Sequence, residues 1–344
     1  MAGAPRPLVA VLGASGATGR AAARRLAATG RGRVRLRLGA RDAAALAAPA
    51  AELGAEAVRV DAGDADALAG FCAGAAVVVQ CAGPSLRLTP AVLAAALAAG
   101  AHLVDPAGDL DPFPTGDRSV VLGTGVVPGL SGLLPRLLPP GARRLDLYAG
   151  GADRLTPAAA ADVLLSVPPR YGLPRALWRD GGPVEAALAV QPAVSLPGFD
   201  GPVHAVPLLT AEAQRLAADT GAAQLRAYSV FPGPGLPDTL ASAWASGDPL
   251  AHVDAVIAAA DADVAAHGVA ITLLASARYA DGARRVLLRS TDSLALTGAF
   301  TALAVTDVLA GRVPPGVGRA AEVLDPVTTA ARLSADPSVD ELRY

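Results

Sequence analysis

One glycine-rich turn near the start of the chain constrains the fold more than any other feature. An apolar run ends at Leu12, and three glycines spaced by three residues follow it at Gly13, Gly16 and Gly19. An alanine-rich run that favours a helix begins directly afterwards. A strand, a tight turn and a helix start in this order present unpaired N–H groups and the positive end of the helix dipole to an anion. The stretch therefore predicts a pyrophosphate site, against the simpler interpretation of a plain glycine-rich turn.

Strands and helices alternate through the first third of the chain. Short apolar runs end in Gly, Asp or Pro, and alanine-rich runs separate them. The expected strands after the first cover 34–39, 57–60, 76–81, 102–105 and 119–123, and the expected helices between them cover 41–53, 64–69 and 89–99. This rhythm predicts an α/β fold with a Rossmann-type, doubly wound parallel sheet.

The pattern changes after Gly125, where strand-like runs begin to alternate and long loops separate them. Strands are expected at 145–149, 184–190, 225–230, 269–279 and 284–288, with a hairpin turn at Asp281-Gly282. Helices are expected to end near 138 and to cover 211–218, 239–245 and 249–266. An amphipathic helix over 293–310 resembles the helices of the first domain. We therefore predict a Rossmann domain at 1–125 plus 293–344, with an inserted α+β substrate or oligomerisation domain at 126–292.

The composition excludes several classes of function. The 344 residues carry a net charge of −2, which gives no electrostatic reason to bind nucleic acid or an anionic membrane. The chain contains no lysine, so a lysine base, a Schiff base and a Tyr-x-x-x-Lys pair are all excluded. Its two cysteines, Cys72 and Cys81, lack metal-ligand spacing, and no metal site is expected. No stretch reads as a signal peptide or a membrane span, so we expect reduced thiols and a cytoplasmic location.

An ordered series of motifs extends from the glycine turn to the C-terminal region. It comprises GASGATG at 13–19, GAR at 39–41, CAGP at 81–84, VDPAGD at 104–109, GVVPG at 125–129, LTGAF at 296–300 and GRVPPGV at 311–317. With this series the chain resembles the saccharopine dehydrogenase-like NAD(P)-binding oxidoreductases. The resemblance covers nearly the whole chain, though only loosely in the middle, and implies a nicotinamide cofactor. It does not select the reaction, because such proteins include opine-type imine reductases and trans-acting enoyl reductases.

The expected cofactor site follows the carboxyl ends of the first four strands. Its candidate residues are Gly13, Ser15, Gly16, Ala17, Thr18, Gly19, Arg41, Asp61, Cys81, Ala82, Gly83 and Pro84. An NAD enzyme usually places an acidic residue where this chain has Leu38 to Arg41. Arginine can grip a 2′-phosphate with its fork of donors, so NADP is favoured over NAD. The alternatives are that Arg41 begins a helix in solvent beside Asp42, and that Cys81 is packed rather than reactive.

Two aspartates after the fifth strand are candidates for acid–base chemistry. Asp105 and Asp109 flank the short segment 106–108, where a carboxyl group near the nicotinamide could transfer a proton or hold a substrate ammonium. The alternative for each is the capping of a turn, which is the preferred interpretation of Asp105. Because lysine is absent, the remaining proton sources are Tyr171, His204, the substrate or water.

A loop-rich stretch in the middle of the chain combines arginines with aromatic residues. Arg170 or Arg175 could fix a substrate carboxylate in a bidentate pair, and the alternative is a solvated basic face. His204 is a further substrate-binding candidate, against a structural role in a strand. Together the features predict a homodimeric, NADPH-dependent reductase acting on the C=N bond of a small, carboxylate-bearing metabolite. The alternatives are a trans-acting enoyl (C=C) reductase and an NADP-binding sensor without turnover.

Overall fold

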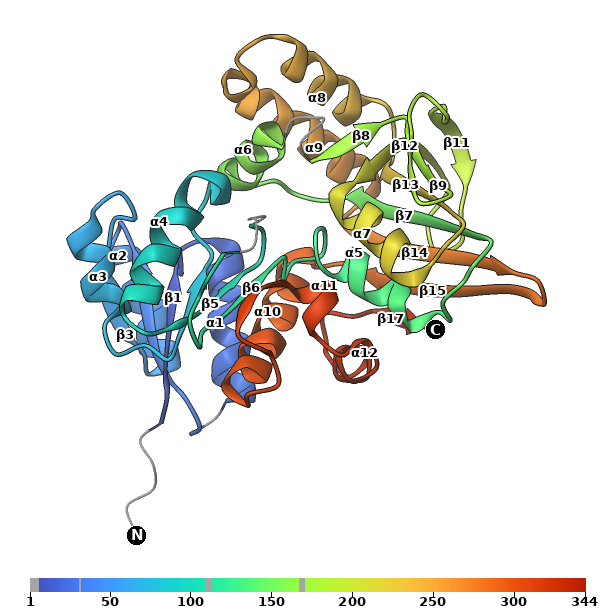
Figure 1. Ribbon diagram of the computed structural model, residues 1–344. Helices are drawn as coiled ribbons and strands as arrows, with labels where there is room; N and C mark the ends of the chain where they lie inside the picture. Colours follow the sequence, from blue (N-terminus) through green and yellow to red (C-terminus); the bar gives the residue numbers. More distant parts are fainter. Residues whose placement is uncertain (1–5, 31, 109–112, 167–170) are drawn as a thin grey trace. The chain divides into compact units, whose positions relative to one another are not determined.

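The computed structural model describes residues 6–30, 32–108, 113–166 and 171–344. Contacts divide the chain into two compact units, most of whose elements are labelled in Figure 1. The first unit contains Met1–Leu130 and Leu294–Asp325, and the second contains Ser131–Ser293 and Pro326–Tyr344. Two of the predicted site residues, Asp109 and Arg170, lie outside the described residues.

The first unit is built on a parallel sheet of seven strands in the order β16-β6-β5-β4-β1-β2-β3. The strands are β1 (Leu8–Leu12), β2 (Arg35–Ala40), β3 (Glu56–Arg59), β4 (Val77–Gln80), β5 (His102–Asp105), β6 (Ser119–Leu122) and β16 (Gly316–Arg319). The helices are α1 (Ala17–Thr29), α2 (Ala44–Leu53), α3 (Ala65–Cys72), α4 (Ser85–Ala98), α10 (Ser293–Leu309) and α11 (Ala320–Val323). This arrangement confirms the predicted doubly wound α/β fold.

Helices on both faces bury the central strands of this sheet. Every residue of β1 and of β4 is buried, which explains why β1 and the first three residues of β4 form continuous apolar runs in the sequence. On one face Phe71 of α3 and Val92 of α4, both 0% exposed, belong to one core cluster with Leu12 and Leu103 of the sheet. Because the faces are covered, the carboxyl ends of the strands are the part of the sheet that is left for a ligand.

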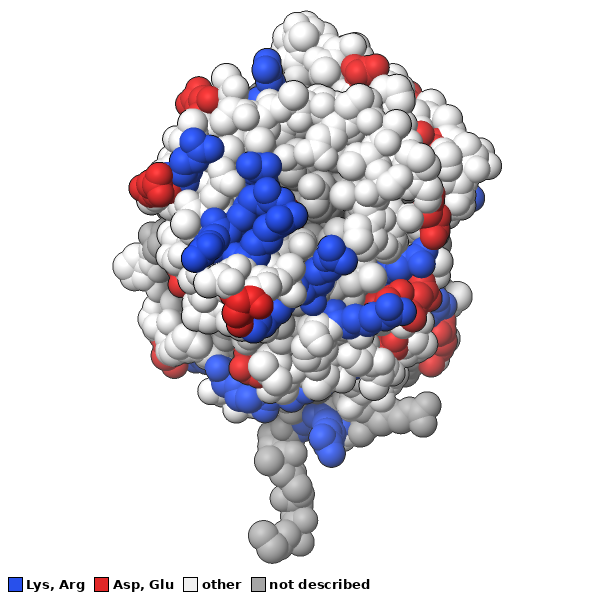
Figure 2. All heavy atoms as spheres, turned by 90° about the vertical axis from the view of Figure 1, so that its right-hand side faces the viewer, with Lys and Arg blue, Asp and Glu red and all other residues white. Residues whose placement is uncertain are grey.

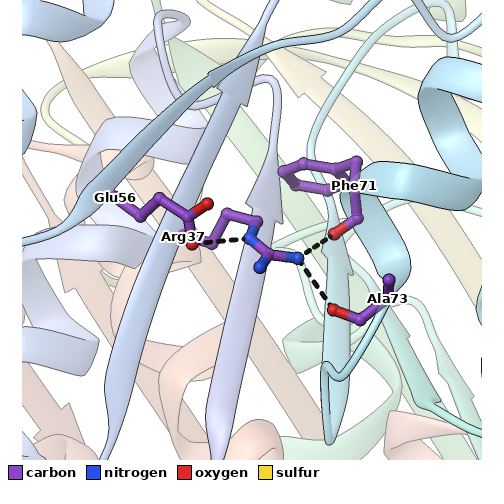
Figure 3. Close-up of polar contacts among 4 residues, drawn as sticks. All are labelled: Arg37, Glu56, Phe71 and Ala73. Carbon is purple, nitrogen blue, oxygen red and sulfur yellow. Dashed lines mark hydrogen bonds and ion pairs between the residues drawn. The ribbon is translucent and has the colours of Figure 1, made fainter.

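An arginine ties the edge of the sheet to the end of α3 (Figure 3). Arg37 on β2 pairs with Glu56 on β3, with 2.8 Å between Nε and Oε2. Its Nη1 donates to the carbonyl oxygens of Phe71 at 2.8 Å and Ala73 at 2.9 Å. Carbonyls at a helix end lack intrahelical donors, and Arg37 supplies them. Arg37 is therefore a structural arginine whose charge is neutralised within the sheet edge.

Helix α10 returns to the first unit and packs on α1. A Cβ atom on Gly298 would lie 2.6 Å from the carbonyl carbon of Ala21, so the two helices are in close backbone contact there. The hydroxyl oxygens of Thr301 and Thr124 are 3.1 Å apart, which joins α10 to the segment after β6. The predicted amphipathic pattern is wrong for this helix, because only Thr306 of its residues is exposed.

The second unit contains a mixed sheet of ten strands. Its main path is β10-β9-β13-β7-β14-β15-β17, and β12 pairs with β13, β11 and β8. The bounds are β7 (Arg144–Ala152), β8 (Gly172–Pro174), β9 (Leu177–Arg179), β10 (Gly182–Val184), β11 (Gln191–Ser195), β12 (Pro202–Thr210), β13 (Gln224–Phe231), β14 (Ala270–Tyr279), β15 (Gly282–Ser290) and β17 (Glu341–Arg343). The hairpin predicted around Asp281 joins β14 to β15, where Tyr279 pairs with Gly282.

The helices of the second unit form two groups. Helix α7 (Ala211–Thr220) packs on β12 and β13. Helices α6 (Pro157–Leu165), α8 (Gly235–Ala245) and α9 (Val253–His267), with the 3-10 turn η2 (Pro249–His252), pack together around Leu164, Leu240 and Val256 (Figure 1). The remaining elements are α5 (Leu130–Leu133), the 3-10 turn η1 (Leu134–Leu137) and α12 (Pro326–Ser334).

Three sequence predictions differ from the structure of the second unit. The expected strand over 184–190 is absent beyond Val184, because the chain turns at 185–186, where Ala186 has a φ angle of +51°. The expected helix that ends near 138 is split into α5 and η1, and Pro135 at the junction cannot donate an α-helical hydrogen bond. The sequence indicates only a strand-like context around His204, whereas strand β12 covers Pro202–Thr210 and includes Pro207.

The C-terminal residues also differ from the predicted division. The sequence assigned all of 293–344 to the Rossmann domain, whereas Pro326–Tyr344 belongs by contact to the second unit. The reason is the pairing of β17 with β15, in which Leu342 lies opposite Leu288. Among the described residues, no helix has the length and apolar character needed to cross a membrane.

Arginine supplies every positive side chain, because lysine is absent. In the second unit, Arg226 on β13 lies opposite Asp146 on β7. On the other side of β7, Asp146 lies opposite Ser276 on β14, which in turn lies opposite Arg285 on β15. Figure 2 shows arginine side chains gathered on one face of the molecule, with acidic side chains beside some of them. The two signs of charge are therefore interspersed, in keeping with the small net charge.

Candidate functional site

The glycine turn joins β1 to α1 and is anchored to the end of β2. Gly13 has a φ angle of +77°, a left-handed conformation that glycine adopts without strain. The N–H groups of Gly13 and Ala14 both donate to the carbonyl oxygen of Gly39, with N···O distances of 2.8 and 3.0 Å. The Gly16 N–H donates to the Gly13 carbonyl at 2.9 Å. These bonds fix the turn at the carboxyl edge of the sheet.

The three glycines of the turn are needed for different reasons. A Cβ atom on Gly13 would lie 2.6 Å from the backbone nitrogen of Ala82, and one on Gly19 would lie 2.4 Å from the Gly13 carbonyl oxygen. A Cβ atom on Gly16 would meet only that same oxygen, at 3.2 Å, and Gly16 is exposed. The first and third glycines therefore permit close packing, and the second leaves the outer side of the turn open to a ligand.

The start of α1 has the features of an anion site. Its N-cap is Gly16, no side chain caps it, and its first turn contains no acidic residue. The first N–H groups of a helix have no acceptor within the helix, which here concerns Ala17 and Thr18. Arg20 adds positive charge beside the turn. Its Nη2 donates to the Ser15 carbonyl oxygen at 2.7 Å, which holds the guanidinium group there. A diphosphate group fits this place by charge and by hydrogen-bonding capacity.

The loop after β4 meets the glycine turn at the point where the strand order reverses. Ligands of open α/β sheets bind at such points. Gln80, which is buried, shapes the loop: its Nε2 donates to the Ala82 carbonyl at 2.8 Å, and the Ala82 N–H donates to its Oε1 at 3.1 Å. Cys81, Ala82, Gly83 and Pro84 are all partly exposed. The structure thus brings these four predicted residues beside the glycine turn.

The Cys81 thiol is held in its neutral form by its surroundings. Burial raises the pKa of Cys81 well above its ordinary value, and the nearby Asp105 raises it further. Burial also raises the pKa of Cys72 to about 11. Because the thiolate is the reactive form, a raised pKa lowers the reactive fraction at neutral pH. The packed interpretation of Cys81 is the one that this geometry favours.

We expect both thiols to resist the disulfide reagent DTNB at pH 8 in the folded chain and to react after denaturation. The reason is that pH 8 lies below both raised pKa values, so few thiolates form until burial is lost. The release of the thionitrobenzoate anion, followed by absorbance, measures the number of reactive thiols. Rapid labelling of one thiol in the native chain would contradict this account.

The ends of β2 and β3 carry Arg41 and Asp61, both exposed. The Arg41 side chain forms no hydrogen bond or ion pair with any described residue. Asp42, which weakened the phosphate prediction, uses its Oδ1 to accept the Ala44 N–H at 2.9 Å at the start of α2. Asp61 accepts the Gly63 N–H at 2.9 Å and so closes a turn. The cofactor role of Asp61 stays a prediction.

Asp105 is 1% exposed and bonded through both carboxylate oxygens. Its Oδ2 accepts from the hydroxyls of Thr89 at 2.6 Å and Ser85 at 3.4 Å, and its Oδ1 accepts from the Ala107 N–H at 2.8 Å. The carboxylate therefore ties the first turn of α4 to the loop after β5. These bonds favour a structural role for Asp105, and the geometry gives no support to a role in catalysis.

The predicted substrate residues of the second unit are spread along β12 instead of being gathered. The Tyr171 carbonyl accepts the Ala211 N–H at 3.3 Å, the Arg175 N–H donates to Pro207 at 3.0 Å, and His204 pairs with Phe231. Ala211, the residue bonded to Tyr171, lies seven positions (211 − 204 = 7) from His204, which corresponds to roughly 23 Å at about 3.3 Å per residue of extended chain. Arg175 is exposed, with its Nε donating to the Leu188 carbonyl at 3.2 Å. These three side chains do not form one carboxylate site.

Sequence reasoning missed four residues that shape the site. Gln80 carried a signal, since it is the one polar residue that ends an otherwise apolar strand. No sequence signal marks Arg20, Arg59 and Thr89. The two arginines bond to backbone carbonyl oxygens, and Thr89 bonds to Asp105, which is 16 residues away in the sequence. Within the ranges that the structure describes, no three His, Cys, Asp or Glu side chains lie together as a metal site.

Comparisons with known proteins agree with this geometry. Residues 9–119 match the family model described as the saccharopine dehydrogenase NADP binding domain. Among solved structures, apo histidine-tagged saccharopine dehydrogenase (L-Glu forming) from Saccharomyces cerevisiae matches 98% of this chain and 99% of its own, with a TM-score of 0.67 and 16% identity. A match at this identity shows the fold.

A second full-length match is weaker. Apo scyllo-inositol dehydrogenase from Lactobacillus casei covers 96% of this chain and 94% of its own, at 13% identity and a TM-score of 0.46. The comparison with curated proteins finds no match. The domain model covers the glycine turn and the strands around it, and the saccharopine dehydrogenase structure shares the fold of both units. Residues 9–119 thus match the saccharopine dehydrogenase NADP binding domain, and the whole chain shares the fold of the yeast saccharopine dehydrogenase.

Proposed function

We propose that the chain is an NADPH-dependent reductase that acts on the C=N bond of a small, carboxylate-bearing metabolite. The observation that carries the proposal is the uncapped start of α1, placed behind three glycines where the strand order reverses. A diphosphate is the group that best fits N–H donors, a helix dipole and an open glycine surface. The family match over residues 9–119 supports NADP as the dinucleotide.

The residues present fit a dinucleotide along its length. When bound, NADPH supplies a hydride from its nicotinamide ring. The glycine turn holds the diphosphate, and the loop of Cys81 to Pro84 offers small, partly exposed residues beside it. Arg41 lies two positions beyond the anchor residue Gly39, and its exposed side chain has no bonded partner among the described residues. The glycine turn, the loop after β4 and Arg41 together orient the cofactor. The alternative dinucleotide is NAD.

The proton that completes the reduction has to come from a group other than lysine. Asp105 is already bonded through both oxygens, so we assign this role to Asp109, with Tyr171, His204 or water as alternatives. Arg170 or Arg175 is the proposed partner of the substrate carboxylate. An ionised Asp109 could instead stabilise an iminium by charge, which serves the same reaction.

We expect Arg41→Ala to weaken NADPH binding far more than NADH binding. Losing a charge-assisted hydrogen bond to the 2′-phosphate costs about 1.5–3 kcal/mol, which corresponds to roughly a 10- to 100-fold rise in Kd. NADH lacks that phosphate, so its Kd changes little. Fluorescence titration with each cofactor gives both constants. Equal losses for the two cofactors would contradict the NADP assignment.

A panel of acceptors tests the reaction itself. The purified chain is incubated with NADPH and either imines formed from 2-oxo acids and amines or α,β-unsaturated acyl thioesters, and absorbance at the nicotinamide band is followed. With 4-deuterated NADPH, we expect deuterium on the carbon that was bound to nitrogen. Deuterium on a former C=C carbon would favour the enoyl reductase, and tight binding without turnover of any acceptor would favour the sensor.

Compartment and assembly are part of the same proposal. The two cysteines form no disulfide, which suits a reducing compartment, and we assign the chain to the cytoplasm. We also propose a homodimer. Analytical ultracentrifugation of the purified chain measures its mass, and a monomer over the whole concentration range would contradict this part.

A further inference from the structure

We infer that Arg59, at the end of β3, is a second residue that selects NADP over NAD by binding the same 2′-phosphate as Arg41. This inference rests on the proposed function. Arg59 is exposed at the carboxyl edge of the sheet, on the strand next to β2.

The sheet holds Arg41 and Arg59 at adjoining positions. The parallel register of β2 and β3 puts Arg59 opposite Ala40, the residue before Arg41. The Nε of Arg59 donates to the Arg41 carbonyl oxygen, with 3.3 Å between the two atoms. That bond fixes the guanidinium group of Arg59 against the backbone from which the Arg41 side chain extends. Two positive groups therefore share one small region of the sheet edge.

Arg37 provides a comparison on the same pair of strands (Figure 3). Its guanidinium group is largely buried and pairs with Glu56, and it also donates to the carbonyls at the end of α3. Arg41 has no such bond, and Arg59 bonds among the described residues only to the Arg41 carbonyl. Arg37 is thus neutralised by the protein, whereas both terminal nitrogens of Arg59 stay available to a ligand.

The nearest acidic side chains in the sequence do not neutralise the pair. Asp42 accepts a backbone N–H at the start of α2, at 2.9 Å. Asp61 accepts a backbone N–H within the turn after β3, also at 2.9 Å. Neither forms an ion pair with Arg41 or Arg59 among the described residues. Two exposed cations without a carboxylate partner repel each other, so an anion between them is favourable.

The position of the pair matches the part of a dinucleotide that distinguishes NADP from NAD. The Gly39 carbonyl anchors the glycine turn, and Arg41 follows two residues later. Neither Gly39 nor Ala40 provides an acidic side chain at the position where NAD enzymes bind the ribose hydroxyls. A phosphate monoester at that ribose carries up to two charges and three acceptor oxygens, enough for two guanidinium forks.

The test compares Arg59→Gln and Arg59→Lys with the unaltered chain by calorimetric titration. The ligands are NADP⁺, NAD⁺, adenosine 2′,5′-bisphosphate and AMP. We expect Arg59→Gln to raise the Kd of NADP⁺ and of the bisphosphate by about tenfold, and to leave NAD⁺ and AMP within about twofold. Arg59→Lys keeps the charge without the fork and is expected to lie between the two.

Two further measurements separate phosphate binding from a structural role. Arg35→Gln is the matched control, because Arg35 is an exposed arginine at the opposite end of β2, and it is expected to leave all four constants unchanged. The effect of Arg59→Gln is expected to shrink below about pH 6, where the phosphate dianion takes up a proton and keeps a single negative charge. A purely structural residue would not follow the ionisation of the ligand.

The outcomes distinguish this inference from the proposed function. If Arg59→Gln binds NADP⁺ as the unaltered chain does while Arg41→Ala loses it, the inference fails and the proposed function stands. If Arg59→Gln weakens NADP⁺ and NAD⁺ equally, Arg59 does not select the phosphate and the inference fails. If the unaltered chain binds neither dinucleotide, the proposed function fails and the inference with it.

Discussion

Gly16→Val is expected to raise the Kd for NADPH by at least about 100-fold while the chain still folds. Gly16 has extended backbone angles, φ −77° and ψ 166°, which valine can adopt. Its Cβ would meet only the Gly13 carbonyl oxygen, at 3.2 Å, a contact that a small shift relieves. The valine methyl groups would then occupy the open side of the turn, where the diphosphate is expected, and exclude it.

Fluorescence titration with NADPH and a thermal unfolding curve measure the two effects. Gly70→Val in α3 is the matched control, because a Cβ at Gly70 meets nothing within 4 Å. Gly19→Val provides the opposite case, since its Cβ would lie 2.4 Å from the Gly13 carbonyl oxygen and the loss of stability should accompany the loss of binding. Unchanged NADPH affinity in Gly16→Val would show that the cofactor does not approach this turn.

A chain that ends at Ser293 is expected to be insoluble. The deletion removes α10, whose Leu296, Phe300 and Val305 are each 0% exposed. Burial of each such side chain contributes about 1.5–3 kcal/mol, against a total stability of about 5–15 kcal/mol for a typical domain. It also removes β16, so that β6 becomes an unpaired edge. Exposed apolar surface and an open strand edge both lead to aggregation.

The measurement is the fraction of the chain found in the supernatant after expression. A chain that ends at Asp340 is the control, because it loses only β17 and the last residue, at the edge of the second sheet. We expect this shorter deletion to stay soluble and to bind NADPH. A soluble, NADPH-binding fragment that ends at Ser293 would show that α10 is dispensable for the first unit.

The first unit could be predicted well because its signals are local. Val9 to Leu12 and Val77 to Val79 form continuous apolar runs, as expected of strands covered on both faces. Gly13 and Gly19 follow from close approaches of the backbone, and Gly16 leaves the outer side of the turn open. Parallel strands joined by short helices then leave few topologies, so the order of elements nearly determines the sheet.

The second unit could not be predicted to the same depth, because antiparallel register is not a local property. Pro207 lies inside β12, although proline usually argues against a strand. Tyr171 and Arg175 are close to each other in the sequence, yet pairing along β12 separates Tyr171 from His204. A grouping of polar residues in the sequence therefore gave no reliable site in this unit.

The candidate site was predicted in outline and missed in its supporting contacts. Asp105 carries both alternatives in the sequence, and its bonds to Thr89 and Ser85 of α4 and to the Ala107 N–H favour the structural one. Arg59 resembles any exposed arginine until the register places it beside Arg41. Such roles depend on side chains that are brought together by the fold, which one sequence without relatives does not reveal.

Hydrogen–deuterium exchange of the whole chain, with and without saturating NADPH, tests most directly whether the cofactor binds where this account places it. Amides that are covered or bonded by a ligand exchange more slowly. We predict slower exchange in three segments, 13–20, 39–42 and 80–86, which contain the glycine turn, the end of β2 and the loop after β4. Saturating NADPH that leaves all three unchanged, or slows exchange only elsewhere, would contradict the account.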